Sequence, residues 1–334
     1  ATIASIAGFS AISGSSVASS AAFGKVAYPE MRRFNYSPRL AAGTVAAGAT
    51  IDFLIPPSLG FVIFGMLTEQ SIGKLLISGV LPGLLLAGAF MGILYVWVKF
   101  NPNSALSSPE GVSWKEKMSA LKGIWETVVI FLLVIGGIYT GLFTHNEAAG
   151  VGATLLFIMA FAKKKLTPRI LLDSLFETAR VSVMVLLLVA GANVFSYFLA
   201  LSTIPMKVSA WIGGLAVSKY VILALIVLIY LLLGCFLDAI SMMILTLPVI
   251  FPVIRTLGFD PIWFGVVCVL MMGAGMITPP MGLTVFTVAS VVKEAQVEEV
   301  FRGALPFLIA ILFVTFLVTL FPSIALYLPG LMGR

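Results

Sequence analysis

Long apolar segments separated by short polar ones dominate the pattern of this chain. An α-helix needs about 20 consecutive apolar residues to cross a bilayer. We expect five crossings on this basis, at residues 75–98, 123–143, 147–162, 178–201 and 303–328, the third of them shorter than the rest. The pattern therefore predicts an all-α polytopic membrane protein.

Two further apolar runs, residues 41–68 and 262–291, are interrupted in the middle by a proline pair. The helix-breaking residues are Pro56, Pro57, Pro279 and Pro280. Proline has no N–H and clashes with the preceding helical turn, so both runs are predicted to be broken helices. The carbonyls of Asp52 and Gly275, four residues before each pair, should lose their helical donors.

An apolar segment with a tip of small or polar residues precedes each broken helix. The first tip is Ser13-Gly14-Ser15-Ser16, and the second runs from Gly234 to Asp238. Residues 219–254 are long enough to enter the bilayer and return to the same side only if each limb crosses about half of it. We therefore expect two re-entrant hairpins. The first hairpin has only its returning limb complete, which suggests a longer parent chain.

An internal repeat relates the two halves of the sequence. Four prolines at positions 29, 38, 56 and 57 recur with one constant offset of 223 residues. Periodic self-similarity of this kind indicates a repeated structural unit. We expect residues 1–98 to form a first repeat, 99–122 a cytoplasmic linker and 123–334 a second repeat.

The distribution of basic residues predicts the orientation of these repeats, because Lys and Arg collect in short cytoplasmic loops. The basic residues concerned are Arg32, Arg33, Arg39, Lys99, Lys115, Lys117, Lys122, Lys163, Lys164, Lys165 and Arg169. They all fall on one side of the expected topology, and five crossings separate Pro38 from Pro261. An odd number of crossings inverts the second repeat, as in secondary transporters with binding sites at mid-membrane.

Composition supports the membrane class and excludes nucleic acid as a partner. Hydrophobic residues make up 60% of the chain and charged residues only 10%, far from the values of soluble domains. A net charge of +6 in so apolar a chain reflects the basic loops on one side of the membrane.

The broken helices are the candidate chemical sites. Free backbone oxygens beside Ser or Thr hydroxyls suit a small dehydrated cation such as Na⁺, whereas helix N-termini at the same break attract an anion. The alternative is that each proline pair only kinks a helix whose polar groups are satisfied by neighbours.

Three polar features could complete these sites. Asp238 at the second tip should either bind a cation or cap backbone amides. Asp52, at mid-membrane depth, should bind a cation or pair with an Arg or Lys. The serine cluster Ser13, Ser15 and Ser16 could supply hydroxyl ligands or simply permit close packing.

Two other classes of protein remain open at this point. Paired membrane aspartates would suit an intramembrane aspartyl protease, but neither aspartate lies in a motif of that class. A non-transporting scaffold subunit would have no need of two broken helices. We expect a transporter and not an enzyme.

Several motifs in order make the chain resemble the large membrane subunit of the tripartite ATP-independent periplasmic (TRAP) transporters. They are SGSSVASSAAFG at 13–24, LIPPS at 54–58, GGIYTGLFTHNEAA at 136–149, GCFLDAISMMILTLPVIFP at 234–252 and MITPPMGLTVF at 276–286. The resemblance covers essentially the whole chain. It also implies that additional N-terminal spans precede the first hairpin in the family.

The resemblance implies a Na⁺-driven, elevator-type importer of an organic anion in the bacterial inner membrane. Its partners would be a small membrane subunit, a soluble periplasmic binding protein and the lipid bilayer, with Na⁺ as coupling ion and no organic cofactor. The substrate would be a carboxylate such as a C4-dicarboxylate or a sialic or other sugar acid.

The resemblance also assigns site residues, through the motifs that match. Sodium would bind in the second repeat at Gly234, Asp238, Gly275, Thr278 and Met281, and in the first at Ser13, Ser16, Asp52 and Ile55. The substrate would bind between Ser13, Gly14, Ser15, Ser16 and Val17 on one tip and Gly234 and Asp238 on the other. Many family members have glycine in place of Asp52.

Overall fold

The computed structural model describes residues 2–104, 125–214 and 217–332, which form helices and connecting turns without a β-strand. Four helical segments in these ranges are long and apolar enough to cross a membrane. They are Ile72–Phe100, Pro168–Ser202, Ala239–Thr256 and Val297–Leu320. The prediction of an all-α protein with membrane-length helices is confirmed.

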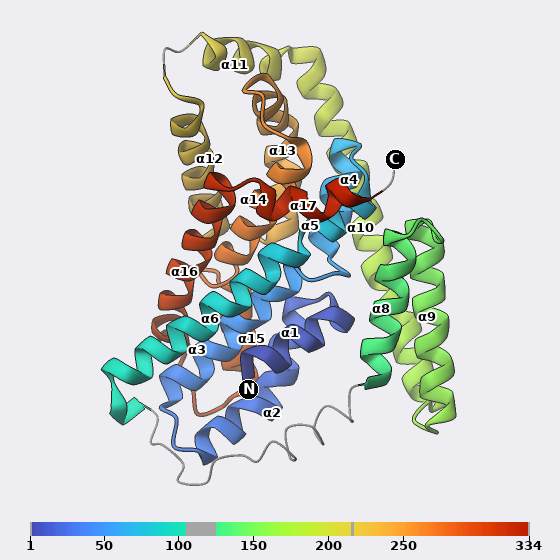
Figure 1. Ribbon diagram of the computed structural model, residues 1–334, viewed down its shortest axis with the longest axis vertical. Coiled ribbons are helices and arrows are strands. Elements are labelled where there is room, and N and C mark those ends of the chain that lie inside the picture. The colour runs from blue at the N-terminus through green and yellow to red at the C-terminus, as the bar shows by residue number, and fades with distance from the viewer. Residues whose placement is uncertain (1, 105–124, 215–216, 333–334) are drawn as a thin grey trace. The chain divides into compact units, whose positions relative to one another are not determined.

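The chain divides into two compact units. The larger contains residues 1–111 and 206–331, and the smaller contains residues 112–205 with 332–334. The N-terminal part of the larger unit follows a simple order of helices (Figure 1). These are α1 (Thr2–Ser13), α2 (Ser16–Arg33), α3 (Pro38–Gly48), the 3-10 helix η1 (Ala49–Phe53), α4 (Leu59–Thr68), α5 (Ile72–Ser78), α6 (Val80–Phe100) and the short η2 (Pro102–Ser104).

The C-terminal part of the larger unit is likewise a series of helices. It contains α11 (Ile204–Gly213, in this unit from residue 206), α12 (Lys219–Gly234), α13 (Ala239–Thr256), α14 (Pro261–Gly275), α15 (Leu283–Val291), α16 (Val297–Leu320) and α17 (Ser323–Leu331). Helix α14 is the centre of the core, because every residue from Trp263 to Gly275 is buried. The Trp263 indole N–H also donates to the Val318 carbonyl of α16 at 2.8 Å, which fixes these two helices together.

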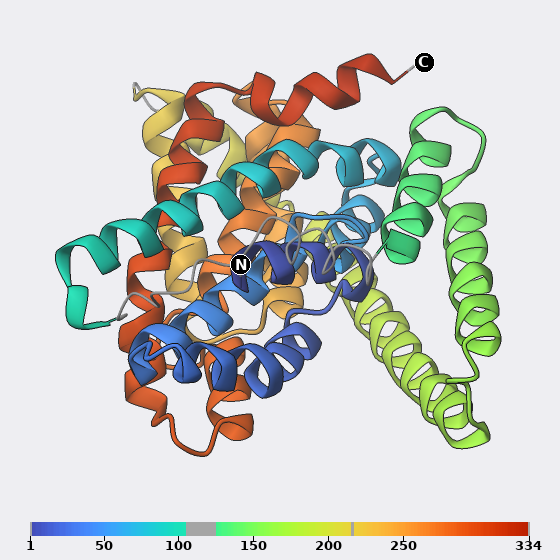
Figure 2. The same ribbon diagram turned by 60° about the horizontal axis from the view of Figure 1, so that its bottom comes forward.

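The two parts of the larger unit are interleaved. Helix α15 packs against α2, α4 packs against α13, and α16 packs along α3. Gly43 and Gly303 lie at the crossing of α3 and α16. A Cβ at Gly43 would overlap the Gly303 backbone, and a Cβ at Gly303 would overlap the Arg39 backbone of α3. Figure 2 shows α2, in blue, beside the orange α15. The segment after the first break, α4, is thereby held against α13 of the C-terminal part, and the segment after the second break, α15, against α2 of the N-terminal part.

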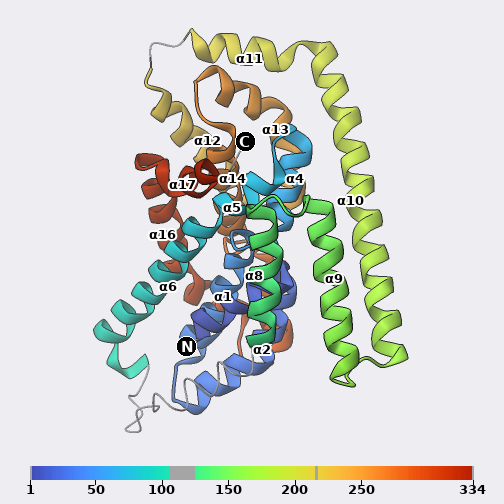
Figure 3. The same ribbon diagram turned by 45° about the vertical axis from the view of Figure 1, so that its right-hand side comes forward.

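The smaller unit contains α8 (Trp125–Tyr139), α9 (His145–Ala162) and α10 (Pro168–Ser202). Helix α9 begins with a capping box, in which Thr144 and Glu147 satisfy each other's backbone N–H groups. It packs against α8, as Figure 3 shows. The 35-residue α10 carries many exposed apolar side chains, as expected of a helix whose solvent is lipid.

Several predicted boundaries shift in the structure. The last predicted crossing, 303–328, is wrong at its end, because α16 stops at Leu320 and Pro322 separates it from α17. The crossing predicted at 178–201 begins ten residues earlier, at Pro168, which supplies a favourable first helical position. Of the predicted linker 99–122, residues 105–122 lie outside the described residues.

Candidate functional site

The first helix break lies between η1 and α4. The Pro56–Pro57 peptide bond is cis, and the chain resumes its helix at Leu59. Ser58 caps the new helix, since its Oγ accepts from the Phe61 N–H at 3.4 Å and donates to the Phe53 carbonyl at 2.5 Å. Ser58 is buried, so the N-terminus of α4 is closed by its own side chain.

Asp52 lies in this break with only 1% of its surface exposed. The Ser19 hydroxyl of α2 donates to Asp52 Oδ2, whereas Oδ1 is buried with no hydrogen-bond partner. The Arg or Lys partner considered from the sequence is not present among the described residues, where the ion pair found is a surface contact of Arg33 with Glu30 at 3.6 Å. Among the described residues, the carboxylate is therefore held by neutral hydroxyl groups and not by a cation.

The tip between α1 and α2 packs against this break. Gly14 has a positive φ of 57°, and a Cβ there would lie 2.6 Å from the Pro57 carbonyl oxygen. Ser15 caps α2 through the Ala18 N–H, and the Ser13 hydroxyl donates to the Ser15 carbonyl at 3.3 Å. The Ser16 hydroxyl is buried without a partner. Val17 is exposed. The polar groups of the tip thus divide between local bonds and one free hydroxyl.

The second break, between α14 and α15, is satisfied differently. Its Pro279–Pro280 bond is also cis. Pro279 donates no bond to the Gly275 carbonyl, as predicted, but this carbonyl is not a free oxygen, because the Thr278 N–H donates to it at 3.2 Å in a tightened turn. The Thr278 hydroxyl donates to the Ala274 carbonyl at 2.7 Å. In the first break, by contrast, the Ile55 N–H donates to Ile51 rather than to Asp52.

Helix α15 begins without a side-chain cap. Its N-cap position is Gly282, with a positive φ of 30° and no side-chain hydrogen bond. The first N–H groups of a helix have no partner within the helix, and they carry the positive end of its dipole. Unlike α4, helix α15 therefore lacks a side-chain cap. Of its first N–H groups, that of Thr284 donates to the Met276 carbonyl at 3.3 Å, whereas those of Leu283 and Val285 have no hydrogen-bond partner among the described residues.

The tip between α12 and α13 packs against this second break. Gly234 meets Gly275, where a Cβ on either glycine would lie 2.8 Å from the Cα of the other. The Met281 N–H donates to the Cys235 carbonyl at 3.2 Å. Asp238 is exposed and caps α13, with Oδ2 accepting from the N–H groups of Ile240 and Ser241, each at 3.1 Å. Of the two roles considered for Asp238, the capping role is therefore present.

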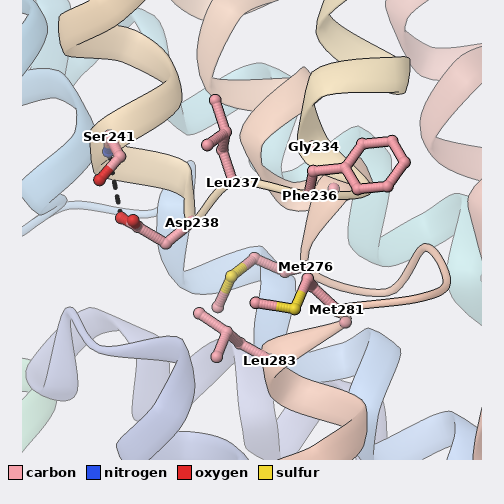
Figure 4. Close-up of a pocket in the computed structure, with 10 residues that line it drawn as sticks. Gly234, Phe236, Leu237, Asp238, Ser241, Met276, Met281 and Leu283 are labelled. Carbon is pink, nitrogen blue, oxygen red and sulfur yellow. Dashed lines mark hydrogen bonds between the residues drawn. The ribbon is translucent and has the colours of Figure 1, made fainter.

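A cavity of about 180 Å³ lies where this tip, the break and the start of α15 meet. It is lined by Gly234, Phe236, Leu237, Asp238, Ser241, Gly275, Met276, Met281, Gly282 and Leu283. Figure 4 shows Met276, Met281 and Leu283 gathered on one side, with the Asp238 carboxylate turned toward Ser241. Asp238 is the one charged residue in this lining, which contains no basic side chain.

The structure thus brings together part of each predicted set. In the second half, Gly234, Asp238, Gly275 and Met281 line one cavity, and Thr278 lies at the adjoining turn. In the first half, Asp52 and Ser16 both have free buried oxygens, whereas the Ser13 hydroxyl is already bonded at the tip. Ser19 was missed, although its i+3 spacing from Ser16 places both hydroxyls on one face of α2.

Asp52 and Asp238 share no hydrogen bond in the structure, and each has its own separate partners. Two carboxylates that share a proton must lie side by side. Their arrangement here gives no support to aspartyl protease chemistry.

Comparison with known proteins places the chain beside membrane transport components. Residues 1–324 match the family described as the tripartite ATP-independent periplasmic transporter, DctM component. The chain is 34% identical over 330 residues to the C4-dicarboxylate TRAP transporter large permease protein DctM of Pseudomonas aeruginosa, covering 97% of this chain and 75% of that protein.

Two further relatives carry other substrate names. The sialic acid TRAP transporter large permease protein SiaM of Vibrio cholerae is 34% identical over 324 residues, covering 97% of this chain and 75% of that protein. The isethionate TRAP transporter permease protein DctMQ of Oleidesulfovibrio alaskensis is 32% identical over 340 residues, and the match covers 99% of this chain but only 52% of that protein. All three names describe permeases.

Proposed function

Because the chain belongs to the DctM component family of the tripartite ATP-independent periplasmic transporters, we propose that it carries an organic anion across the bacterial inner membrane by Na⁺ symport. It works with a small membrane subunit, and a soluble periplasmic protein delivers the substrate. The family name itself denotes a system of three parts. The relatives' names include C4-dicarboxylate, sialic acid and isethionate, all of them organic acids.

The N-terminus of α15, which has no side-chain cap and keeps free N–H groups at Leu283 and Val285, is the observation that carries the proposal for the substrate. It meets the cavity at Gly282 and Leu283, with no side chain to cap it. Free N–H groups at a helix N-terminus are a ready site for a carboxylate or other anion. Because no basic side chain lines this cavity, the backbone donors of α15 are the groups that fit an anionic substrate.

Two inverted repeats form the architecture that we propose for this transport. Under the 223-residue offset, the N-caps Ser15 and Ser37 correspond to the N-caps Asp238 and Asp260. Thr50 and Gly273 are also counterparts under this offset, and they touch, since a Cβ at Gly273 would lie 3.4 Å from the Thr50 Cβ. A residue can contact its own counterpart only near a symmetry axis, which supports a two-fold relation.

The coupling of transport to Na⁺ follows from the binding of a cation in each repeat. The α1–α2 and α12–α13 pairs act as re-entrant hairpins whose tips close over the breaks. Sodium at the first break and at the residues around Gly275, Thr278 and Met281 favours the closed arrangement, because a ligand shifts a conformational balance only by differential affinity. The hairpins and broken helices then slide, as an elevator, against α5, α6 and α16, and the Trp263–Val318 hydrogen bond between α14 and α16 breaks in this step.

Uptake into proteoliposomes tests this proposal. The full-length protein is reconstituted with its small subunit, the binding protein and a labelled pool of organic acids, with and without an inward Na⁺ gradient. We expect uptake to depend on Na⁺ and to fall by about tenfold or more in Thr278→Ala. Uptake of equal rate with K⁺ in place of Na⁺, or no uptake of any acid, would contradict the proposal.

A matched control is available in α16. Thr319 makes the same type of bond as Thr278, since its hydroxyl donates to a carbonyl one turn earlier at 2.8 Å. Thr319→Ala therefore removes an equivalent hydroxyl far along the sequence from either break. We expect its uptake to stay within about twofold of the wild-type rate.

A further inference from the structure

A buried polar cluster at the first break contains more oxygen atoms than its hydrogen bonds use. It consists of Asp52 on η1, Ser16 and Ser19 on α2, and Ser10 on α1. Ser19 holds Asp52 Oδ2, and the Ser10 hydroxyl donates to the Ile6 carbonyl at 2.8 Å. Asp52 Oδ1 and Ser16 Oγ are left buried with no partner.

Within the part of the chain that the structure describes, no basic side chain balances this carboxylate. The helices that pack around η1 are α1, α2, α3, α4, α6 and α14, and their basic residues are engaged or exposed elsewhere. Arg39 donates to the Arg302 carbonyl and stacks over Trp97, Arg32 donates to the Tyr36 carbonyl, and Lys25 is exposed. An ionised carboxylate in an apolar interior is strongly unfavourable unless a positive charge accompanies it.

The unused atoms are all hard oxygens. Asp52 Oδ1 and Ser16 Oγ are free, and the Asp52 backbone carbonyl receives no hydrogen bond, since Pro56 has no N–H to donate to it. Oxygens of this kind are the ligands that small unpolarisable cations take. The donor set therefore fits Na⁺, and it includes the negative charge that neutralises one.

The second repeat has no such side-chain set. Under the 223-residue offset, Ser16, Ser19 and Asp52 correspond to Ala239, Met242 and Gly275. None of these three has a side-chain oxygen, and the Gly275 carbonyl already accepts from Thr278. A cation in the second repeat must therefore rely on neutral groups or on the exposed Asp238.

We propose that the two repeats bind their cations unequally, and that the first repeat supplies its own counter-charge through Asp52, with Ser16 as a second side-chain ligand and Ser19 as the positioning residue. The first cation is bound tightly and without net charge, and the second more weakly. This inference rests on the proposed Na⁺ coupling. It goes beyond that coupling by assigning Ser19 a role and by ranking the two sites.

A binding assay with radioactive Na⁺ tests the ranking of the two sites by affinity. It uses the purified full-length protein with its small subunit, in detergent and without substrate. We expect the binding curve to contain a tighter and a weaker component. Asp52→Asn should weaken the tighter component by about tenfold or more, and Ser19→Ala by severalfold. Thr278→Ala should spare the tighter component and weaken the other.

Ser20→Ala is the matched control for Ser19→Ala. Ser20 is the adjacent buried serine on α2, and its hydroxyl donates to the Ser16 carbonyl at 2.6 Å rather than to Asp52. We expect Na⁺ binding of this variant to equal that of the wild type.

Thermal unfolding in Na⁺-free buffer separates this role from a structural one. Asparagine keeps the shape of Asp52 and removes its charge, so Asp52→Asn should unfold at a higher temperature than wild type without Na⁺ and gain less when Na⁺ is added. A purely structural aspartate would give the opposite result in Na⁺-free buffer.

The possible results test the ranking of the two sites and the proposed Na⁺ symport separately. Unchanged Na⁺ affinity in Asp52→Asn, or loss of the tighter component in Thr278→Ala, overturns the ranking while leaving Na⁺ symport in place. Wild-type protein that binds no Na⁺ overturns both the ranking and the proposed function.

Discussion

The two helix breaks have nearly the same backbone arrangement, but they differ in charge and in the capping of the helix that follows. Both contain a cis Pro-Pro bond, and both meet the tip of a helix pair. At corresponding positions the first break has the buried Asp52 and the second has Gly275, packed against Gly234. Beyond the prolines, Ser58 caps the N-terminus of α4, whereas that of α15 has no side-chain cap.

A broken helix therefore does not by itself determine which ion it binds. A break exposes carbonyls at one end and N–H groups at the other, so it can attract either sign. Side chains then decide: a carboxylate and a capped N-terminus favour a cation in the first break. A glycine, an N-terminus without a side-chain cap and a cavity favour an anion beside the second. Four sets of substitutions test this contrast, in descending order of their expected effect.

Exchanging the two residues that distinguish the breaks should have the largest effect. In Gly275→Asp the new side chain meets the Gly234 backbone, where its Cβ alone would lie 2.8 Å from a Cα. Overpacking and an added buried charge should cost roughly 3 kcal/mol or more of unfolding free energy. Asp52→Gly removes an unpaired carboxylate, so we expect a change of less than about 1 kcal/mol. Thermal unfolding in detergent, followed by tryptophan fluorescence, measures both, and a normal melting temperature for Gly275→Asp would refute the contrast.

The glycines at the two tips should come next. Gly14→Ala places a Cβ 2.6 Å from the Pro57 oxygen and also forces alanine into a positive φ of 57°. Gly234→Ala meets only the close contact with Gly275. We expect each to destabilise by roughly 1–3 kcal/mol, with Gly14→Ala the worse because it carries both penalties.

Gly8 in α1 is the control for this pair, because nothing lies within 4 Å of a Cβ placed there. Gly8→Ala should leave stability unchanged or raise it by up to about 1 kcal/mol, as expected in a helix interior. Equal melting temperatures for all three variants would show that the tips do not pack as described.

The sequence predicted the helices and their breaks well because both depend on local properties. Apolar length and the missing proline N–H act within one segment, and they located the helix breaks at residues 56–57 and 279–280. The same local reasoning failed at the end of α16, where the apolar pattern continues past Leu320 but Pro322 stops the helix. Hydrophobicity alone does not detect such a stop.

The candidate site was only partly predictable, because its hydrogen bonds join distant segments. The bond from Ser19 to Asp52 spans 33 residues of sequence and needs the packing of α2 on η1. The bond from Thr278 to Gly275 depends on how tightly the last turn of α14 closes, which no residue type dictates. Local spacing alone therefore suggested Asp52 and Gly275 as sites, but it did not determine which oxygens stay free.

The cap of α4 gives a smaller test of the contrast. Ser58→Ala removes the acceptor for the Phe61 N–H and the donor to the Phe53 carbonyl in a buried position. We expect a loss of about 1–2 kcal/mol in unfolding free energy. Ser58→Thr, which keeps both bonds, should recover part of it. If Ser58→Ala unfolds at the wild-type temperature, α4 does not depend on this cap, and the capping of the following helix does not distinguish the two breaks.

The caps at the two tips should give the smallest effects, and they separate charge from capping. Asp238 accepts two N–H groups at 3.1 Å, whereas Ser15 accepts one at 3.4 Å. Asp238→Ala should therefore cost about 1 kcal/mol, and Ser15→Ala about half as much. Asp238→Asn keeps an oxygen acceptor, so its stability should lie within a few tenths of a kcal/mol of wild type. Thermal unfolding measures all three variants. A large loss in Asp238→Asn would mean that the charge itself, and not the cap, holds the second tip. The tip would then need a nearby positive charge, which among the lining residues no side chain supplies.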